Sequence, residues 1–159
     1  MWAIWITVVA AALAGFYALQ PETHITAGPP DMALALAGDM ALYRDLLEHY
    51  VAAHPAANGA IPPGAFAQTG NWTYTPQRWE NYVVNGIVLV YPASGASPLP
   101  ANFAAALTTQ AHHSIEAGVV ENGQIVTGSN AGDMANGLAL PGGLPQLSNG
   151  TPVWIAQVF

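Results

Sequence analysis

The hydrophobic residues of this chain are concentrated first at its start, where the run from Trp2 to Leu19 has no charged side chain and only Thr7 as a clearly polar one. An α-helix over this run is about 27 Å long, close to the thickness of a bilayer's hydrocarbon core. Aromatic rings favour the headgroup level of a bilayer, and four of them lie toward the two ends of the run: Trp2, Trp5, Phe16 and Tyr17. The pattern predicts a transmembrane anchor over residues 1–20.

Two alternatives remain open for the same run. A signal peptide has a positively charged start and a shorter apolar region, of roughly 7–15 residues, but the small residues between Ala10 and Ala14 offer a cleavage site. A buried core helix is the other alternative. We expect a retained anchor in a bacterial inner membrane, with a short cytoplasmic N-terminus. The rest then lies in the periplasm, because no lysine or arginine flanks the run to hold it inside.

Polar and apolar residues change their pattern after the run. Residues 21–30, PETHITAGPP, contain three prolines and predict a short stiff linker. Asp31 is a suitable N-cap for a helix that begins at Met32, and His54-Pro55 followed by Asn58-Gly59 predicts its end. We therefore divide the chain into an anchor (1–20), a linker (21–30) and an extracytoplasmic domain (31–159).

The predicted helix has one continuous apolar stripe with spacings of three and four residues. Its members are Leu36, Met40, Tyr43, Leu47 and Tyr50, whereas Arg44, Asp45 and Glu48 lie off it. Gly38 weakens the middle of the helix, and Asp39 offers a second start. The last four members of the stripe are candidates either for the core or for a face that binds a partner.

The rest of the chain favours strands with one further helix. Thr75-Pro76 predicts a short helical turn through Trp79 and Asn81, and Tyr82–Tyr91 predicts a hairpin about Asn85-Gly86. A helix is expected over residues 101–112, and a second hairpin has strands at 115–120 and 124–126. A Gly- and Asn-rich stretch, 128–150, precedes a final strand from Pro152. The expected fold is α+β, with a leading amphipathic helix, an antiparallel sheet of about four or five strands and one inserted helix.

Composition limits the partners of this 159-residue chain. Nine acidic residues against two arginines give a net charge of −7, so the clustered cations that bind nucleic acid are missing. There is no cysteine, which excludes disulfides and thiolate chemistry. Only 7% of the residues are charged, which is typical of a surface that packs within an assembly.

Candidate chemistry is sparse. His112, His113 and Glu116 are the tightest polar group, but the helix is expected to end near Ser114, which separates them; a histidine pair favoured by the helix dipole is the simpler interpretation. Ser94, Ser97 and Ser129 lie in no nucleophile motif, and GSNAG lacks the lysine of a phosphate loop. Four aromatic residues form a candidate sugar site or a loop packed on the core: Trp72, Tyr74, Trp79 and Tyr82. We expect no catalytic, cofactor-binding or metal-binding residues, no nucleotide and no enzymatic activity.

The order of an apolar N-terminal helix, an amphipathic helix and an antiparallel sheet resembles type IV pilins and pseudopilins. Those proteins typically have a glutamate at the fifth position of the mature apolar helix, where this chain has Trp5. The resemblance leaves a minor pilin as an alternative.

A second resemblance covers most of the chain. Its length and apolar start, together with ALYRDLLEHYVAAHPAANGAIP, WTYTPQRWENYVVNGIVLVYPAS, SIEAGVVENGQIV and LPGGLPQLSNGTPVWIAQVF, are similar to the small PilM family of conjugative thin-pilus (type IVb) operons. This family is distinct from the larger actin-like cytoplasmic protein of the same name, which binds nucleotide. The resemblance implies an inner-membrane accessory protein of the pilus basal apparatus whose partners are other pilus-assembly proteins. A minor pilin, or a secreted binding or hydrolytic domain behind a cleaved signal, are the alternatives.

Overall fold

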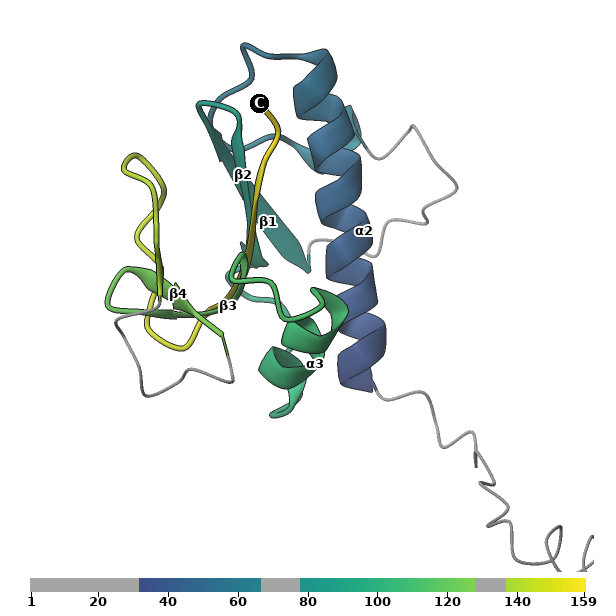
Figure 1. The fold of residues 1–159 in the computed structure, drawn as a ribbon. Coiled ribbons are helices and arrows are strands. Elements are labelled where there is room, and N and C mark those ends of the chain that lie inside the picture. The colour runs from purple at the N-terminus through teal and green to yellow at the C-terminus, as the bar shows by residue number, and fades with distance from the viewer. Residues whose placement is uncertain (1–31, 67–77, 128–136) are drawn as a thin grey trace, which may run out of the picture.

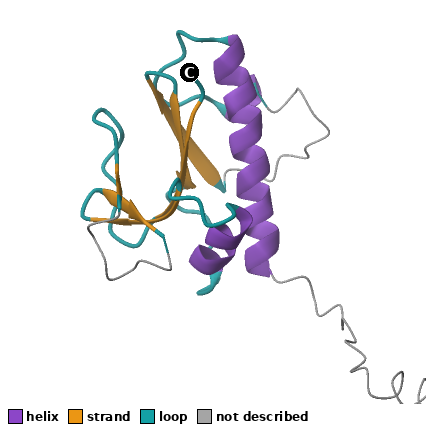
Figure 2. Cartoon of the chain, viewed as in Figure 1, coloured by secondary structure: helices purple, strands orange, loops and turns teal. Residues whose placement is uncertain are grey.

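A computed structural model describes residues 32–66, 78–127 and 137–159. The long helix α2 (Met32–Ala53) leads the described chain, and the short 3-10 helix η1 (Pro63–Ala65) follows it. One further helix, α3 (Phe103–Gln110), separates two β-hairpins. As Figures 1 and 2 show, α2 lies along one face of the sheet, with α3 beside its first half.

Six strands form one antiparallel sheet in the order β1-β2-β6-β3-β4-β5. The strands are β1 (Trp79–Val84), β2 (Ile87–Pro92), β3 (Ala117–Glu121), β4 (Gln124–Val126), β5 (Leu138–Ala139) and β6 (Pro152–Gln157). The β1–β2 and β3–β4 hairpins turn at Asn85-Gly86 and Asn122-Gly123, where all four residues have positive φ. That conformation is the type I′ turn that Asn-Gly favours. Strand β6 joins the two hairpins by pairing with both β2 and β3.

Each face of the sheet has its own hydrophobic core. The larger core lies between the sheet and the two helices and includes Met40 and Leu47 of α2, Phe103 of α3 and Trp154 of β6. The second core, centred on Leu89 of β2, is partly covered by residues of the 138–147 segment. The domain is therefore α+β, with helices on one face of an antiparallel sheet, as the sequence predicts.

Two predictions about the strands are wrong. Trp79 and Asn81 belong to β1 and not to a helical turn, because burial alternates strictly from Trp79 to Val84 and every one of these residues is paired with β2. The sheet also has six strands, because two residues of the Gly- and Asn-rich stretch, Leu138 and Ala139, pair with β4. The second helix start that Asp39 offers is not used, since α2 is continuous through Gly38 and Asp39.

The predicted anchor and linker, with Trp2, Trp5, Phe16 and Tyr17, lie outside the described residues, as does the proposed N-cap Asp31. Within residues 32–66, 78–127 and 137–159, neither helix is both long and apolar enough to span a membrane.

Candidate functional site

Among the described residues, a cleft of about 770 Å³ lies at the outer edge of β1, the edge strand of the sheet. We call it the β1-edge cleft. One wall is the segment that precedes η1, the floor is the start of β1, and the other wall is the loop after β2. Its lining includes Ile61, Pro62, Arg78, Trp79, Glu80, Asn81, Tyr91, Ser94 and Ser97.

The floor of the cleft is fixed by the buried side chain of Asn81, which is 4% exposed. Its amide nitrogen donates to the hydroxyl oxygen of Tyr43 at 2.7 Å and to the main-chain oxygen of Ile61 at 2.8 Å. Its amide oxygen accepts from the main-chain N–H of Ile61 at 2.9 Å. These three hydrogen bonds, the Asn81 network, join β1 to α2 and to the first wall, because buried polar groups are stable only when they are paired.

A second contact joins the start of β1 to α2. The indole Nε1 of Trp79 donates to Oδ2 of Asp39 at 2.8 Å, and the ring stacks on Phe103 with a centroid separation of 5.7 Å. The ring is buried while its N–H finds a partner, as buried tryptophans usually require. Contacts with both α2 and α3 therefore fix the position of Trp79 at the floor of the cleft.

The outer edge of β1 is covered along only part of its length. The main chain of Val83 exchanges two hydrogen bonds with Gly59, at 2.7 and 2.9 Å. Since main-chain groups alternate along an antiparallel strand, those of Trp79 and Asn81 point to the same outer side as those of Val83. No other described residue pairs with them. An added strand would pair with β1 through these main-chain groups.

The polar lining of the cleft is mostly neutral. Burial raises the pKa of the Tyr91 hydroxyl, and Glu80, which accepts its hydrogen bond across the β1–β2 pair, raises that pKa further. The hydroxyl is therefore protonated at neutral pH. Arg78 has no ion-pair partner among the described residues. Ser94 and Ser97 are exposed on the second wall, but no histidine is among the lining residues to act as a base for either hydroxyl. The lining suits the binding of an extended, largely uncharged segment.

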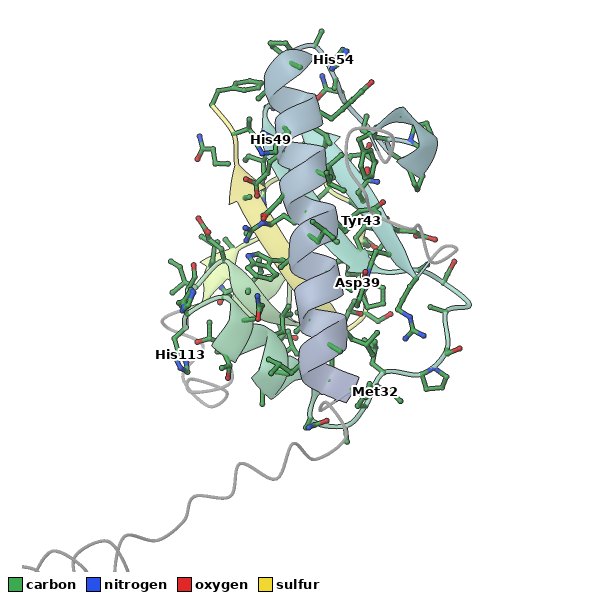
Figure 3. All side chains as sticks on the ribbon, turned by 90° about the vertical axis from the view of Figure 1, so that its right-hand side faces the viewer. Met32, Asp39, Tyr43, His49, His54 and His113 are labelled. Carbon is green, nitrogen blue, oxygen red and sulfur yellow. The ribbon has the colours of Figure 1, made fainter. Side chains whose placement is uncertain are left out.

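The predicted stripe of α2 lies on the side of the helix that faces the sheet. Met40, Tyr43 and Leu47 are buried in the larger core, with the Tyr43 ring meeting Phe66 edge-on at 5.1 Å. Tyr50 is half-buried and stacks on the ring of His54 at 4.2 Å. Figure 3 shows the opposite, outer side of the helix, on which His49 is exposed.

The predicted histidine group lies just past the end of α3. His112 N–H donates to the Thr109 oxygen and His113 N–H to the Thr108 oxygen, which is the Schellman arrangement that ends many helices. Both histidines are exposed with φ of 51° and 60°, and Glu116 lies beyond the helix. Among the described residues no group of three or more metal-ligating side chains occurs.

Sequence patterns did not identify the β1-edge cleft. Of the four aromatic residues proposed for a sugar site, Trp79 lines the cleft, Tyr82 is half-buried on the opposite face of β1, and Trp72 and Tyr74 lie outside the described residues, as does Ser129. The partners of Asn81 lie 20 and 38 residues away in the chain. No local periodicity in the sequence indicates hydrogen bonds between residues so far apart.

Comparisons with known proteins identify a family and a solved structure to which this chain is similar. A model of the PilM family matches residues 8–155 of the chain. Among solved structures, the chain is similar to a crystal structure of PilM from Escherichia coli B7A, with 18% sequence identity and a TM-score of 0.50. That similarity covers 79% of this chain and 91% of the other, and at such identity it shows a shared fold. No curated protein matches the chain.

Proposed function

The chain belongs to the PilM family, and from this premise we propose that it is a single-pass inner-membrane protein that docks other components of type IV thin-pilus assembly. The family match over residues 8–155 is the observation that carries the proposal. It begins inside the apolar run that we expect to be the anchor and extends through the α+β domain, which supports treating the two as parts of one protein architecture. In this proposal the span fixes the domain at the periplasmic face of the membrane.

The β1-edge cleft supports a docking role. It combines an open strand edge with a mostly neutral lining, and main-chain hydrogen bonds at such an edge give affinity for an extended segment of another protein. Because few charges are involved, binding should depend only weakly on salt. We propose no enzymatic activity, cofactor or nucleotide for this role.

Topology is the first test of the proposal. A periplasmic reporter fused after Phe159 should be active, and a cytoplasmic reporter at the same place should be inactive. N-terminal sequencing of the mature protein should find Met1 retained. A new N-terminus beyond Ala14 would indicate a cleaved signal, and a methylated first residue would indicate pilin-type processing.

Loss of the gene is the second test. Surface pili should fail to form while pilin synthesis and processing continue, and a version with an unrelated anchor of the same orientation should restore much of the assembly. If the protein is instead a minor pilin, the swap should fail and the protein should be present in sheared filaments above trace level.

A substitution in the cleft tests docking separately from topology. Ser94→Trp adds a large ring to the exposed wall of the cleft and should abolish rescue of pilus formation without lowering protein level. Ser148→Trp is the matched control, because Ser148 is also exposed but lies outside the cleft lining. Equal rescue by both variants would show that partners bind elsewhere.

A further inference from the structure

The first two turns of α2 expose apolar side chains at the end of the domain where the chain enters it. Met32 is 69% exposed and Leu34 is 47% exposed, although both belong to a regular helix. Figure 3 shows Met32 at one end of α2 and His54 at the other, so these side chains lie at an extremity of the domain. Exposed apolar groups that cluster at one end of a domain usually mark a contact surface.

Two stretches at this end of the domain contain no charged residue. No charged residue occurs between Met32 and Gly38, nor between Ala93 and Gln110, the segment that contains α3. Helix α3 lies beside the first half of α2 (Figure 1), so both stretches contribute to one end of the domain. We call it the α2-start surface. Within α2 the charged residues begin at Asp39, after this surface.

The distribution of charge along α2 explains this separation. At 1.5 Å per residue, Asp45 lies about 16 Å and Glu48 about 21 Å along the helix from Leu34. Both distances exceed the screening length of about 8 Å at physiological salt. Asp31 precedes Met32 in the sequence and lies outside the described residues. The nearest described carboxylate of α2, Asp39, accepts the hydrogen bond of the Trp79 indole. A negatively charged lipid surface that touched the start of α2 would therefore meet little repulsion from Asp45 and Glu48.

We propose that the α2-start surface rests end-on against the bilayer, with Met32 and Leu34 in the headgroup region and the charged part of α2 pointing away from it. This proposal rests on the proposed function, because it requires the predicted anchor at residues 1–20. The eleven residues from 21 to 31 span at most about 40 Å when extended, so the anchor keeps this end of the domain near the membrane. A contact with lipid then orients the β1-edge cleft relative to the membrane instead of leaving the domain free to turn on its linker.

The chain offers a matched pair of positions for the test. Leu34 and Leu42 have the same side chain, similar exposure (47% and 42%) and the same helix, but they lie about 12 Å apart along its axis. Because the chain has no cysteine, Leu34→Cys and Leu42→Cys can each be labelled with one environment-sensitive fluorophore. The labelled full-length proteins are reconstituted into phosphatidylcholine–phosphatidylglycerol vesicles, with or without lipids that carry a nitroxide in the headgroup region.

Nitroxide lipids should quench the probe at position 34 several-fold more than the probe at position 42, while a water-soluble quencher should show the reverse preference. Thermal unfolding of both labelled proteins verifies that they are folded. If the protein floats with the vesicles but neither probe is quenched by nitroxide lipids, the predicted anchor is supported and the proposed contact of the α2-start surface with lipid is wrong. Protection of both probes from the water-soluble quencher without lipid quenching would assign the face to a second copy or another protein. If the protein does not float with the vesicles, the membrane topology is wrong, and this inference fails with it.

Discussion

Removal of the Asn81 side chain is the sharpest test of how the β1-edge cleft is held. Asn81→Ala deletes the bonds to Tyr43 and to both main-chain groups of Ile61. Each such bond contributes about 1 kcal/mol net, and a buried group left without a partner costs about 1–3 kcal/mol more. Because Ile61 is itself buried, we expect the free energy of unfolding to fall by about 3 kcal/mol, or the melting temperature by about 6–12 °C.

Two further variants apportion this loss. Tyr43→Phe removes only the hydroxyl partner and should cost about 1 kcal/mol, with a coupling of similar size to Asn81→Ala in a double-mutant cycle. Asn58→Ala is the matched control, because Asn58 also accepts a main-chain hydrogen bond, from Asn85 at 3.1 Å, but on the exposed surface. Its cost should stay within about 0.5 kcal/mol.

Urea unfolding of the full-length protein in mild detergent, followed by tryptophan fluorescence, measures all of these variants, since Trp79 and Trp154 are buried. Hydrogen exchange gives a local readout, because the Ile61 amide bonded to Asn81 should exchange faster in Asn81→Ala. If Asn81→Ala costs no more than Asn58→Ala, the network contributes nothing net, and the first wall of the cleft is held by apolar packing alone.

Three other predictions follow from the helices. Leu47→Ala should lower the free energy of unfolding by about 2–5 kcal/mol in the same urea assay, because Leu47 is fully buried, and a cost near zero would contradict its place in the core. His112→Gly should raise the melting temperature, with a gain of up to about 1 kcal/mol, because glycine adopts positive φ without strain; Asn122→Gly, at nearly the same φ, should gain less because asparagine tolerates that conformation. Burial raises the pKa of Glu48 above 4.5, an effect that the Arg44 guanidinium opposes. Protonation of Glu48 therefore stabilises the fold below pH 4.5, and this gain is lost as pH rises through the raised pKa. Glu48→Gln should flatten that part of the stability–pH curve, and an unchanged curve would exclude Glu48 as its source.

The elements that sequence patterns predicted well are those with a strong local signal. The three- and four-residue spacing from Leu36 to Tyr50 predicted α2, and the two Asn-Gly turns predicted both hairpins. Each signal is contained within a few turns or a few paired residues, so tertiary contacts reinforce it instead of overriding it.

The elements that were missed depend on distant partners. Thr75-Pro76 resembles a helix start, but the residues that follow belong to β1 because they pair with β2. Hydrogen bonds from Trp79 to Asp39 and from Asn81 to Tyr43 stabilise this arrangement. Strand β5 has only two residues and exists through its pairing with β4. The β1-edge cleft brings together three separate segments, and nothing in any one of them indicates the other two.

The central place of β6 has a consequence for how the sheet forms during synthesis of the chain. Strand β6 is the last described strand along the chain, yet it is the element that connects the β1–β2 and β3–β4 hairpins. Until residues 152–157 have emerged, the two hairpins share no neighbour in the sheet, and contacts between distant parts of a chain form slowly. The complete sheet therefore forms only after nearly the whole chain has been made. Under the proposed topology, the domain would cross the membrane before its sheet has formed.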